Sequence, residues 1–372
     1  MRRHALFAAC LGAACTGATD SRPSGFTSVA AGFFHTCGVL DGTATCWGQD
    51  WMGQLGDGVA GESRGTLAPV DGGLRFVVLR GGFQYTCGLT SSGAAYCWGD
   101  RDHGSLGNGN PASGTETRPV RVRGGLTFED LQVSRWKVCG LTAPGAVHCW
   151  GNGDTVPVTV AGAPAFASIT VGNYHACGLT AAGAAHCWGW GEYGQLGNGD
   201  PAYRTTPVAV SGGHTFASLT AGHAHTCGLT TSGTAHCWGF GAGGALGTGD
   251  TLSRGVPTAV GGGLSLTILV AGDHHTCGVT SAGAAWCWGA DGVGQLGTGV
   301  PPASCGPVRG PCRVSPTPVA GGLGFTSLVA SLMHTCGLVA GGEAYCWGSN
   351  DDGQLGIGTV GGGSATPVAV MR

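Results

Sequence analysis

The stretch His35-Thr36-Cys37-Gly38 decides the fold, because the chain repeats it in varied form along its whole length. Internal repeats of 20–50 residues indicate solenoids, propellers or arrays. The cysteines of successive copies are 50, 52, 38, 50, 50 and 59 residues apart. The six further copies are Tyr85-Thr86-Cys87-Gly88, Lys137-Val138-Cys139-Gly140, His175-Ala176-Cys177-Gly178, His225-Thr226-Cys227-Gly228, His275-Thr276-Cys277-Gly278 and His334-Thr335-Cys336-Gly337.

Two more motifs follow each copy. A Cys-Trp-Gly sequence places tryptophans at Trp47, Trp98, Trp150, Trp188, Trp238, Trp288 and Trp347. A Gly-Gln-Leu-Gly sequence or a relative then occupies 53–56, 104–107, 194–197, 244–247, 294–297 and 353–356. The third unit, with the 38-residue spacing, has lost this last segment.

Each unit offers about four short strands bounded by glycine and no helical period, as at 26–30, 36–40 and 44–47. Units of roughly 50 residues with four strands predict an all-β fold, a seven-bladed β-propeller in which each unit is one blade. A parallel β-helix is the alternative, although its repeats are shorter. We expect a single ring over 24–372, with units at about 24–70, 71–120, 121–160, 161–210, 211–260, 261–320 and 321–372.

The hairpin turns set the pairing of the cysteines. Asp41-Gly42 is a two-residue turn, which places Cys37 opposite Cys46. In the other units the loop is one residue longer and ends in glycine, and the second cysteine has moved with it. Because opposed residues lie within disulfide range, we predict seven bridges within blades. The pairs are Cys37 with Cys46, Cys87 with Cys97, Cys139 with Cys149, Cys177 with Cys187, Cys227 with Cys237, Cys277 with Cys287, and Cys336 with Cys346.

Cys305 and Cys312 lie in an insertion of the sixth unit and are expected to form an eighth bridge. Zinc is the competing interpretation, since histidines accompany the cysteines. However, the sequence contains no Cys-x-x-Cys, and an exported chain favours disulfides. We therefore expect no metal and no cofactor.

The first eighteen residues predict export. Arg2 and Arg3 precede an apolar run over 5–14 and then small residues, which is typical of a secretory signal over 1–18. Leu11 to Cys15 also resembles a bacterial lipoprotein signal, in which Cys15 would be acylated. Ordinary cleavage after Ala18 is the alternative. Both alternatives predict an extracellular, periplasmic or cell-surface location and no transmembrane segment. Acylation of Cys15 would add a lipid anchor.

The composition narrows the classes of protein further. Glycine supplies 76 of 372 residues without a three-residue period, which excludes collagen. Charged residues are 10% and apolar residues 42%, which argues against disorder. A formal charge of −3 leaves no basic surplus for nucleic acid.

These repeats resemble those of the regulator-of-chromosome-condensation family, whose units combine Gly-x-x-His-Thr, a Trp-Gly and Gly-Gln-Leu-Gly. The resemblance covers residues 24–372 and implies a seven-bladed propeller. Within the family, the chain resembles a secreted, disulfide-rich bacterial branch. The family founder is a guanine-nucleotide exchange factor that binds chromatin, and a secreted bacterial relative inhibits β-lactamases. The leader takes this chain out of the nucleus and cytosol, so exchange activity is not expected.

The variable loops supply the candidate binding face. The Gly-x-x-His loop and the segment after Trp-Gly are predicted to lie on one face of the ring, and aromatic and arginine side chains on loops of a rigid scaffold are typical of protein-binding hot spots. Some of them would instead only cap the blade cores. The candidates are Phe33, Phe34, Trp51, Phe83, Arg101, Arg135, Trp136, Tyr174, Trp190, Tyr193, His223, Phe240, His274 and Met333.

The residues that recur in every unit are expected to have structural roles. The tryptophans should pack between blades, and His35 and its equivalents should bond neighbouring backbone groups. No P-loop or Gly-x-Ser-x-Gly elbow occurs, so no catalytic residue is predicted. We therefore predict a monomeric protein-binding scaffold with a protein partner. The alternatives are an enzyme inhibitor of the β-lactamase-inhibitor type, a propeller lyase or hydrolase, and a purely structural role at the cell surface.

Overall fold

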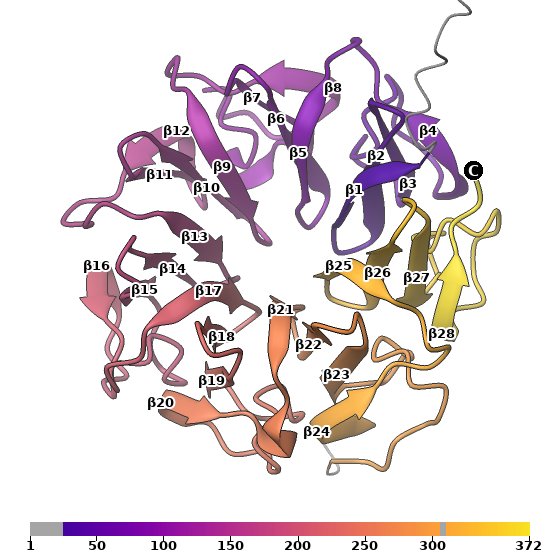
Figure 1. Cartoon of the computed structure of the whole chain (residues 1–372). Coiled ribbons are helices and arrows are strands. Elements are labelled where there is room, and N and C mark those ends of the chain that lie inside the picture. Colours follow the sequence, from indigo (N-terminus) through magenta and orange to yellow (C-terminus); the bar gives the residue numbers. More distant parts are fainter. Residues whose placement is uncertain (1–24, 306–309) are drawn as a thin grey trace, which may run out of the picture.

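The computed structural model describes residues 25–305 and 310–372, and the predicted leader with Cys10 and Cys15 lies outside them. Seven four-stranded antiparallel sheets stand around a central axis as the blades of a β-propeller (Figure 1). The described residues contain no α-helix, only the short 3-10 turns η1 (Asp102–Gly104) and η2 (Gly261–Gly263). The predicted fold class is confirmed.

Each blade consists of four consecutive strands, so its sheet is built from one sequence unit. Blades 1 and 2 contain β1 (Phe26–Ala31), β2 (His35–Leu40), β3 (Thr43–Gly48), β4 (Arg64–Pro69), β5 (Phe76–Gly81), β6 (Tyr85–Thr90), β7 (Ala95–Asp100) and β8 (Thr115–Arg121). Blades 3 and 4 contain β9 (Phe128–Val133), β10 (Lys137–Thr142), β11 (Ala146–Gly151), β12 (Asp154–Thr159), β13 (Ser168–Val171), β14 (His175–Leu179), β15 (Ala185–Gly189) and β16 (Arg204–Ala209).

The remaining three blades follow the same order. Blades 5 and 6 contain β17 (Phe216–Ala221), β18 (His225–Thr230), β19 (Ala235–Gly239), β20 (Arg254–Ala259), β21 (Leu266–Ala271), β22 (His275–Thr280), β23 (Ala285–Ala290) and β24 (Cys312–Pro318). Blade 7 contains β25 (Phe325–Ala330), β26 (His334–Val339), β27 (Ala344–Gly348) and β28 (Ser364–Ala369). The first strand of each blade lies nearest the axis in Figure 1. Among the described residues no strand is exchanged between the first and last blades, so their contact closes the ring without a shared sheet.

The hairpins have the register that the turns predict. Asp41 and Gly42 both have positive φ, as a two-residue turn of type I′ requires, and Leu40 pairs with Thr43. Cys37 therefore lies opposite Cys46, and the two form a disulfide with a Cα–Cα distance of 4.0 Å. The other predicted blade pairs are also disulfides, as is the Cys305–Cys312 pair of the insertion.

The apolar core is divided into seven clusters, and each lies between two adjacent blades. In the cluster between blades 1 and 2, Val39 and Leu55 of the first blade pack against Phe76, Leu79 and Trp98 of the second. Each tryptophan is thus buried against its neighbouring blade, as expected. Because a single sheet cannot bury both faces alone, the contact surface between blades, which we call a seam, is where the fold gains its hydrophobic stabilisation.

One backbone carbonyl in each Gly-Gln-Leu-Gly turn joins a blade to the next. Between blades 1 and 2, the Gln54 carbonyl accepts from Trp98 Nε1 at 3.0 Å and from Thr86 Oγ1 at 2.8 Å. The same pair of bonds joins blades 4 to 5, 5 to 6 and 6 to 7. It also joins blade 7 to blade 1, where Gln354 accepts from Trp47 and Thr36. The ring therefore closes by the contact that its other seams use.

The repeated histidine adds a third bond to this seam. His35 Nε2 lies 2.8 Å from Thr86 Oγ1, whose own proton goes to Gln54. The histidine must therefore be the Nε2–H tautomer and donate to the threonine, and its buried Nδ1 has no partner among the described residues. We expected a backbone partner, and the structure shows a threonine hydroxyl instead. At the second blade Tyr85 replaces histidine, and its hydroxyl donates to the Ser134 carbonyl at 3.0 Å.

Burial keeps these histidines neutral. It lowers the pKa of His35, His175, His225 and His334 to about 3 and that of His275 to about 4. An imidazolium inside the seam would lose its hydration shell without gaining a counter-ion.

The last glycine of the turn is required by the next blade's tryptophan. Gly56 has φ +77°, and a Cβ atom there would collide with the indole of Trp98. Leu55, just before it, is fully buried in the seam. We call the space beside the next blade's tryptophan, which receives the leucine and the carbonyl of the turn, the socket. The turn can enter it only if its final residue has no side chain.

Blade 3 lacks the Gly-Gln-Leu-Gly turn. Asn152 and Gly153 form a tight turn that joins β11 directly to β12, where the other blades insert a long loop. No turn segment therefore crosses from blade 3 to blade 4. Trp188 of blade 4 has no hydrogen-bond partner for its Nε1–H among residues 25–305 and 310–372. Its ring lies nearly parallel to Phe166, at 16°, whereas the Phe–Trp pairs of the other blades are tilted by 39–54°.

The neutral histidines predict a steep acid dependence of stability. Below pH 6.5 the unfolded chain binds protons at these five positions while the folded ring does not, so the free energy of unfolding must fall as pH falls. Asp50 acts in the opposite direction, because burial raises its pKa to about 6. We expect a net uptake of roughly four protons on unfolding at pH 5, measured from denaturant unfolding between pH 4.5 and 7. His175→Gln should lower that number by about one, and an uptake of one proton or less in the unsubstituted chain would contradict neutral histidines.

The hydrogen bond from Trp98 to the turn carbonyl predicts that Trp98 and Trp188 contribute differently to the free energy of unfolding. Trp98→Phe loses an indole and a buried hydrogen bond to Gln54, whereas Trp188→Phe loses only the indole. We expect Trp98→Phe to reduce the free energy of unfolding by about 1 kcal/mol more than Trp188→Phe does. Denaturant unfolding of both variants at pH 7 measures the difference. Equal losses would show that the Trp98 bond contributes nothing.

Candidate functional site

The two variable loops of each blade lie side by side on one face of the ring, as predicted. The backbone N–H of Gln49, after Trp-Gly, donates to the Phe34 carbonyl of the Gly-x-x-His loop at 2.9 Å. The same bond runs from Trp190 to Tyr174 in blade 4 and from Ser349 to Met333 in blade 7. We call this side of the propeller the loop face.

Aromatic side chains of blades 1 to 3 touch one another across this face. Phe83 packs edge-to-face against both Phe33 and Phe34, with ring centroids 5.4 Å apart in each case. The guanidinium carbon of Arg135 lies 4.5 Å from the ring centroid of Phe83 and 4.5 Å from that of Trp136. The arginine is therefore held between two rings in cation–π contacts.

The series continues over blades 4 to 6. The Arg135 backbone N–H donates to Asn173 Oδ1 at 3.2 Å, which joins blade 3 to blade 4. The ring of Tyr174 lies 6.1 Å from that of Trp190 and 4.9 Å from His223, and His223 lies 4.9 Å from His274. We call this set the aromatic arc; it comprises Phe33, Phe34, Phe83, Arg135, Trp136, Tyr174, Trp190, His223 and His274.

The other predicted face residues lie apart from the arc. Trp51 is 60% exposed, and Tyr193 packs against Phe240 with ring centroids 4.8 Å apart. Met333 is half-buried in the blade 7 loop. Arg101 pairs with Glu116 at 2.8 Å and bonds two carbonyls of its own loop, so it has a structural role. Within the arc, Phe33 is buried and packs against its half-buried neighbours Phe34 and Phe83.

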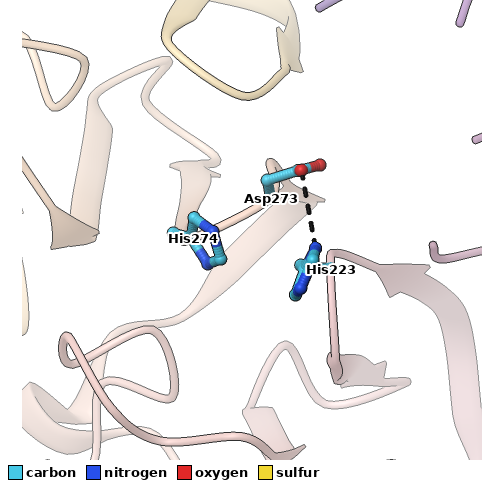
Figure 2. Close-up of side chains that lie close together, drawn as sticks. All are labelled: His223, Asp273 and His274. Atoms are coloured by element: carbon cyan, nitrogen blue, oxygen red, sulfur yellow. Dashed lines mark ion pairs between the residues drawn. The ribbon is translucent and has the colours of Figure 1, made fainter. Parts of the chain in front are cut away.

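A polar cluster lies beside the narrow mouth of the central channel. Asp273 Oδ2 accepts from Asn173 Nδ2 at 2.9 Å. The same oxygen lies 3.7 Å from His223 Nδ1, and His274 lies beside this pair (Figure 2). The candidate ligand atoms of His223, Asp273 and His274 lie within 4.8 Å of one another. Two imidazoles and a carboxylate are a ligand set that suits Zn²⁺, so these residues could hold a metal ion. The channel beside them has room for about 70 Å³ and is lined mainly by alanine and glycine.

The seam between blades 3 and 4 opens into a much larger cleft of about 550 Å³. The turn that closes the other seams is absent there. Blade 3 contributes β12 and its neighbours to one wall, and blade 4 contributes β14 and β15 to the other. The side chains that carry its chemistry are Trp136, Lys137, Asp154, Tyr174, Trp188, Trp190, Tyr203 and Arg204.

Lys137 is the only lysine in the sequence and occupies the position of the repeated histidine. Burial lowers the pKa of its ammonium group, and the nearby Asp154 carboxylate opposes this shift. Its side chain forms no ion pair within residues 25–305 and 310–372. Across the cleft, Arg204 is paired with Asp200, which leaves the lysine as the cation available to a bound molecule.

The sequence signals for this cleft were visible but incomplete. The short spacing of the third unit and the loss of its Gly-Gln-Leu-Gly segment are plain in the sequence. Only the structure shows that this segment belongs to the next blade's socket, so that its loss opens a site. Asn173, Asp273 and Tyr203 were not predicted, because nothing in their local sequence marks them as partners of residues on other blades.

Sequence profiles now identify the repeats. The profile described as the regulator of chromosome condensation (RCC1) repeat matches 182–229 and 341–372. A second profile of the same description matches 166–195, 267–295 and 325–354. The chain carries repeats of the RCC1 type.

Known proteins resemble the chain over different extents. The ultraviolet-B receptor UVR8 of Arabidopsis thaliana is 31% identical over 127 residues, which are 33% of this chain and 29% of the receptor. Prp20p of Saccharomyces cerevisiae has a TM-score of 0.78 at 19% identity, over 94% of this chain and 88% of Prp20p. The ectodomain of the Physcomitrella patens receptor kinase CR4 has a TM-score of 0.56 at 25% identity, over 87% of this chain and 74% of that one. At these identities the structural likeness shows the fold.

The described part of the chain has no helix that is long and apolar enough to cross a membrane.

Lys137 provides a direct probe of the cleft. Reductive ¹³C-methylation labels this single lysine, and NMR can follow its titration. Because burial disfavours the charged amine, we expect it to titrate below a methylated free lysine. Asp154→Asn should lower its pKa further, since the carboxylate stabilises the ammonium form. A pKa equal to that of free lysine would show that the amine projects into solvent instead.

Proposed function

We propose that this chain is an exported scaffold that binds a protein partner through its loop face. The observation that carries the proposal is the aromatic arc. Ring and cation–π contacts join the loops of blades 1 to 3 and those of blades 4 to 6, and the hydrogen bond from Arg135 to Asn173 joins the two groups. Protein-binding hot spots are enriched in tryptophan, tyrosine and arginine. A disulfide within each blade ties together the two strands that carry these loops, so little conformational entropy is lost on binding.

The chemistry of the arc favours a particular kind of partner surface. Its rings form an apolar surface interrupted by one guanidinium, that of Arg135. The two exposed aromatic residues Tyr174 and Trp190 can be covered by apolar side chains of a partner. Arg135 lies between two rings, and the N–H groups at the edge of its guanidinium can donate to a carboxylate of the partner.

Known RCC1-like propellers support binding as the activity. The reported structure of Prp20p concerns its binding to Gsp1p and histones, and a further structure shows Kap60 bound to yeast RCC1 (Prp20). The present chain is 19% identical to Prp20p, so we do not assign the partners of Prp20p to it. We carry over only protein binding by a propeller face.

Export is supported by the eight disulfides and by the leader. Such bridges persist in oxidising compartments and are rare in the cytosol. We propose that 1–18 is a signal peptide, with Cys15 as the acylation site if the chain is a lipoprotein. The mature protein is then one ring over 24–372.

The proposal predicts where substitutions abolish binding. The double variant Phe34→Ser/Phe83→Ser removes arc residues of blades 1 and 2, which lie away from the cleft. We expect it to reduce capture of partners from the envelope and secreted fractions of the source organism at least tenfold, as hot-spot loss does. Val77→Ser is the matched control, because Val77 is exposed at the opposite end of its blade. Capture that is lost with Val77→Ser and kept in the double variant would place the interface on the other face.

A further inference from the structure

Six of the seven seams contain the same bound segment, supplied by the chain itself. The leucine of the Gly-Gln-Leu-Gly turn belongs to the apolar cluster of its seam and has no exposed surface. The residue before it presents its carbonyl to the next blade's tryptophan. These leucines are Leu55, Leu106, Leu196, Leu246, Leu296 and Leu355. The cluster between blades 3 and 4 has no such leucine.

The side chains around the missing segment show that the socket is open. Trp188 is 4% exposed, whereas the six equivalent tryptophans are at 0%. Cys149 is 6% exposed, although the other cysteines of the blade disulfides are at 0%. Both residues line the 550 Å³ cleft. Trp188 is thus more than nine-tenths buried as a residue, and its indole N–H is a hydrogen-bond donor without a partner among the described residues.

We propose that this socket binds a Gly-x-Leu-Gly-type turn from a partner protein, in place of the segment that blade 3 lacks. The inference rests on the proposed function and names the element that the partner inserts. The leucine would occupy the apolar base near Cys149, Val160 and Ala176. The carbonyl before it would accept from Trp188 Nε1, as Gln195 does from Trp238 at 3.0 Å one seam further on.

A closed turn suits the socket better than an extended strand. The chain's own turns are closed by two successive bonds, Gly194 to Gly191 at 2.7 Å and Gly197 to Gly194 at 2.9 Å. This shape brings the leucine and the carbonyl together at one point, below the tryptophan. In an extended peptide the side chains point above and below the plane of the strand and the carbonyls point sideways within it, so a leucine side chain and the adjacent carbonyl would not enter one cleft together.

Two substitutions distinguish the open socket from the filled ones. Ala176 stands where blades 1, 2, 5, 6 and 7 have the threonine that donates to the turn carbonyl. Lys137 stands where five blades have histidine. The lysine offers a cation to an acidic side chain that flanks the partner's turn, which the chain's own neutral histidines do not. The site therefore favours an acidic Leu-containing turn from another protein.

The test uses a head-to-tail cyclic peptide with the sequence of residues 191–199, Gly-Glu-Tyr-Gly-Gln-Leu-Gly-Asn-Gly. Fluorescence anisotropy of the labelled peptide measures its affinity for the full chain. We expect the peptide to bind, to protect Lys137 from acetylation, and to lose binding when its leucine is replaced by aspartate. Equal binding of the aspartate peptide, or no binding of either, would overturn the socket.

Variants of the protein make the test specific. Trp188→Phe should weaken the peptide about tenfold, and Ala176→Thr should tighten it about fivefold by adding the missing donor. Trp238→Phe, in a filled seam, should leave the affinity unchanged. A gain of affinity in Ala176→Thr cannot arise from misfolding. If neither Trp188→Phe nor Ala176→Thr changes the affinity, the peptide binds elsewhere and the proposal is wrong.

A graft supplies the final control. Replacing Asn152 and Gly153 by the sequence of residues 190–203 gives blade 3 the missing turn, which should fill the socket and abolish peptide binding. Unchanged peptide binding by the folded graft would overturn the socket. Failure of the peptide, with partner capture still sensitive to Phe34→Ser/Phe83→Ser, would leave the proposed function intact. Peptide binding with capture insensitive to that double variant would overturn the proposed function alone.

Discussion

The peptide carbonyl inside each Gly-Gln-Leu-Gly turn is the group on which the ring depends. It accepts a tryptophan N–H and a threonine hydroxyl from the next blade, and the threonine in turn accepts from the previous blade's histidine. A buried carbonyl without these donors would carry a desolvation cost. The same arrangement joins blade 7 to blade 1, so the ring closes without an exchanged strand. The leucine that follows this carbonyl packs in the apolar core. One short turn therefore supplies both the polar contact and an apolar contact between neighbouring blades.

This dependence explains why the third unit matters to function. Losing the turn removes its leucine and its carbonyl from the seam between blades 3 and 4, which keeps its apolar cluster. Disulfides within blades 3 and 4 keep each hairpin in register without the turn. The result is a cleft whose walls were shaped to hold a peptide turn. It adjoins Trp136, Tyr174 and Trp190, which belong to the aromatic arc. The open seam and the arc thus form one continuous surface on the loop face.

The cysteine pairs illustrate what could be predicted from sequence. The separation of Cys37 from Cys46 is one residue shorter than that of the other pairs, and its turn is one residue shorter as well. Register follows from turn length, so the pairing was accessible without coordinates. The histidines show the limit. A structural role was expected for them, but their partner, a threonine about 50 residues away on the next blade, depends on how the blades pack against one another.

The sequence by itself therefore determined the number of blades, the strands within each and the disulfides, because these follow from repeats and short-range turn geometry. The tertiary structure alone decided that the turn segment of one unit fills the socket of the next. That contact joins residues distant along the chain, such as Gln54 with Trp98 and Gln354 with Trp47. It likewise decided that Asn173, His223 and Asp273 meet beside the channel. Only packing between blades brings such residues together, and no local pattern records it.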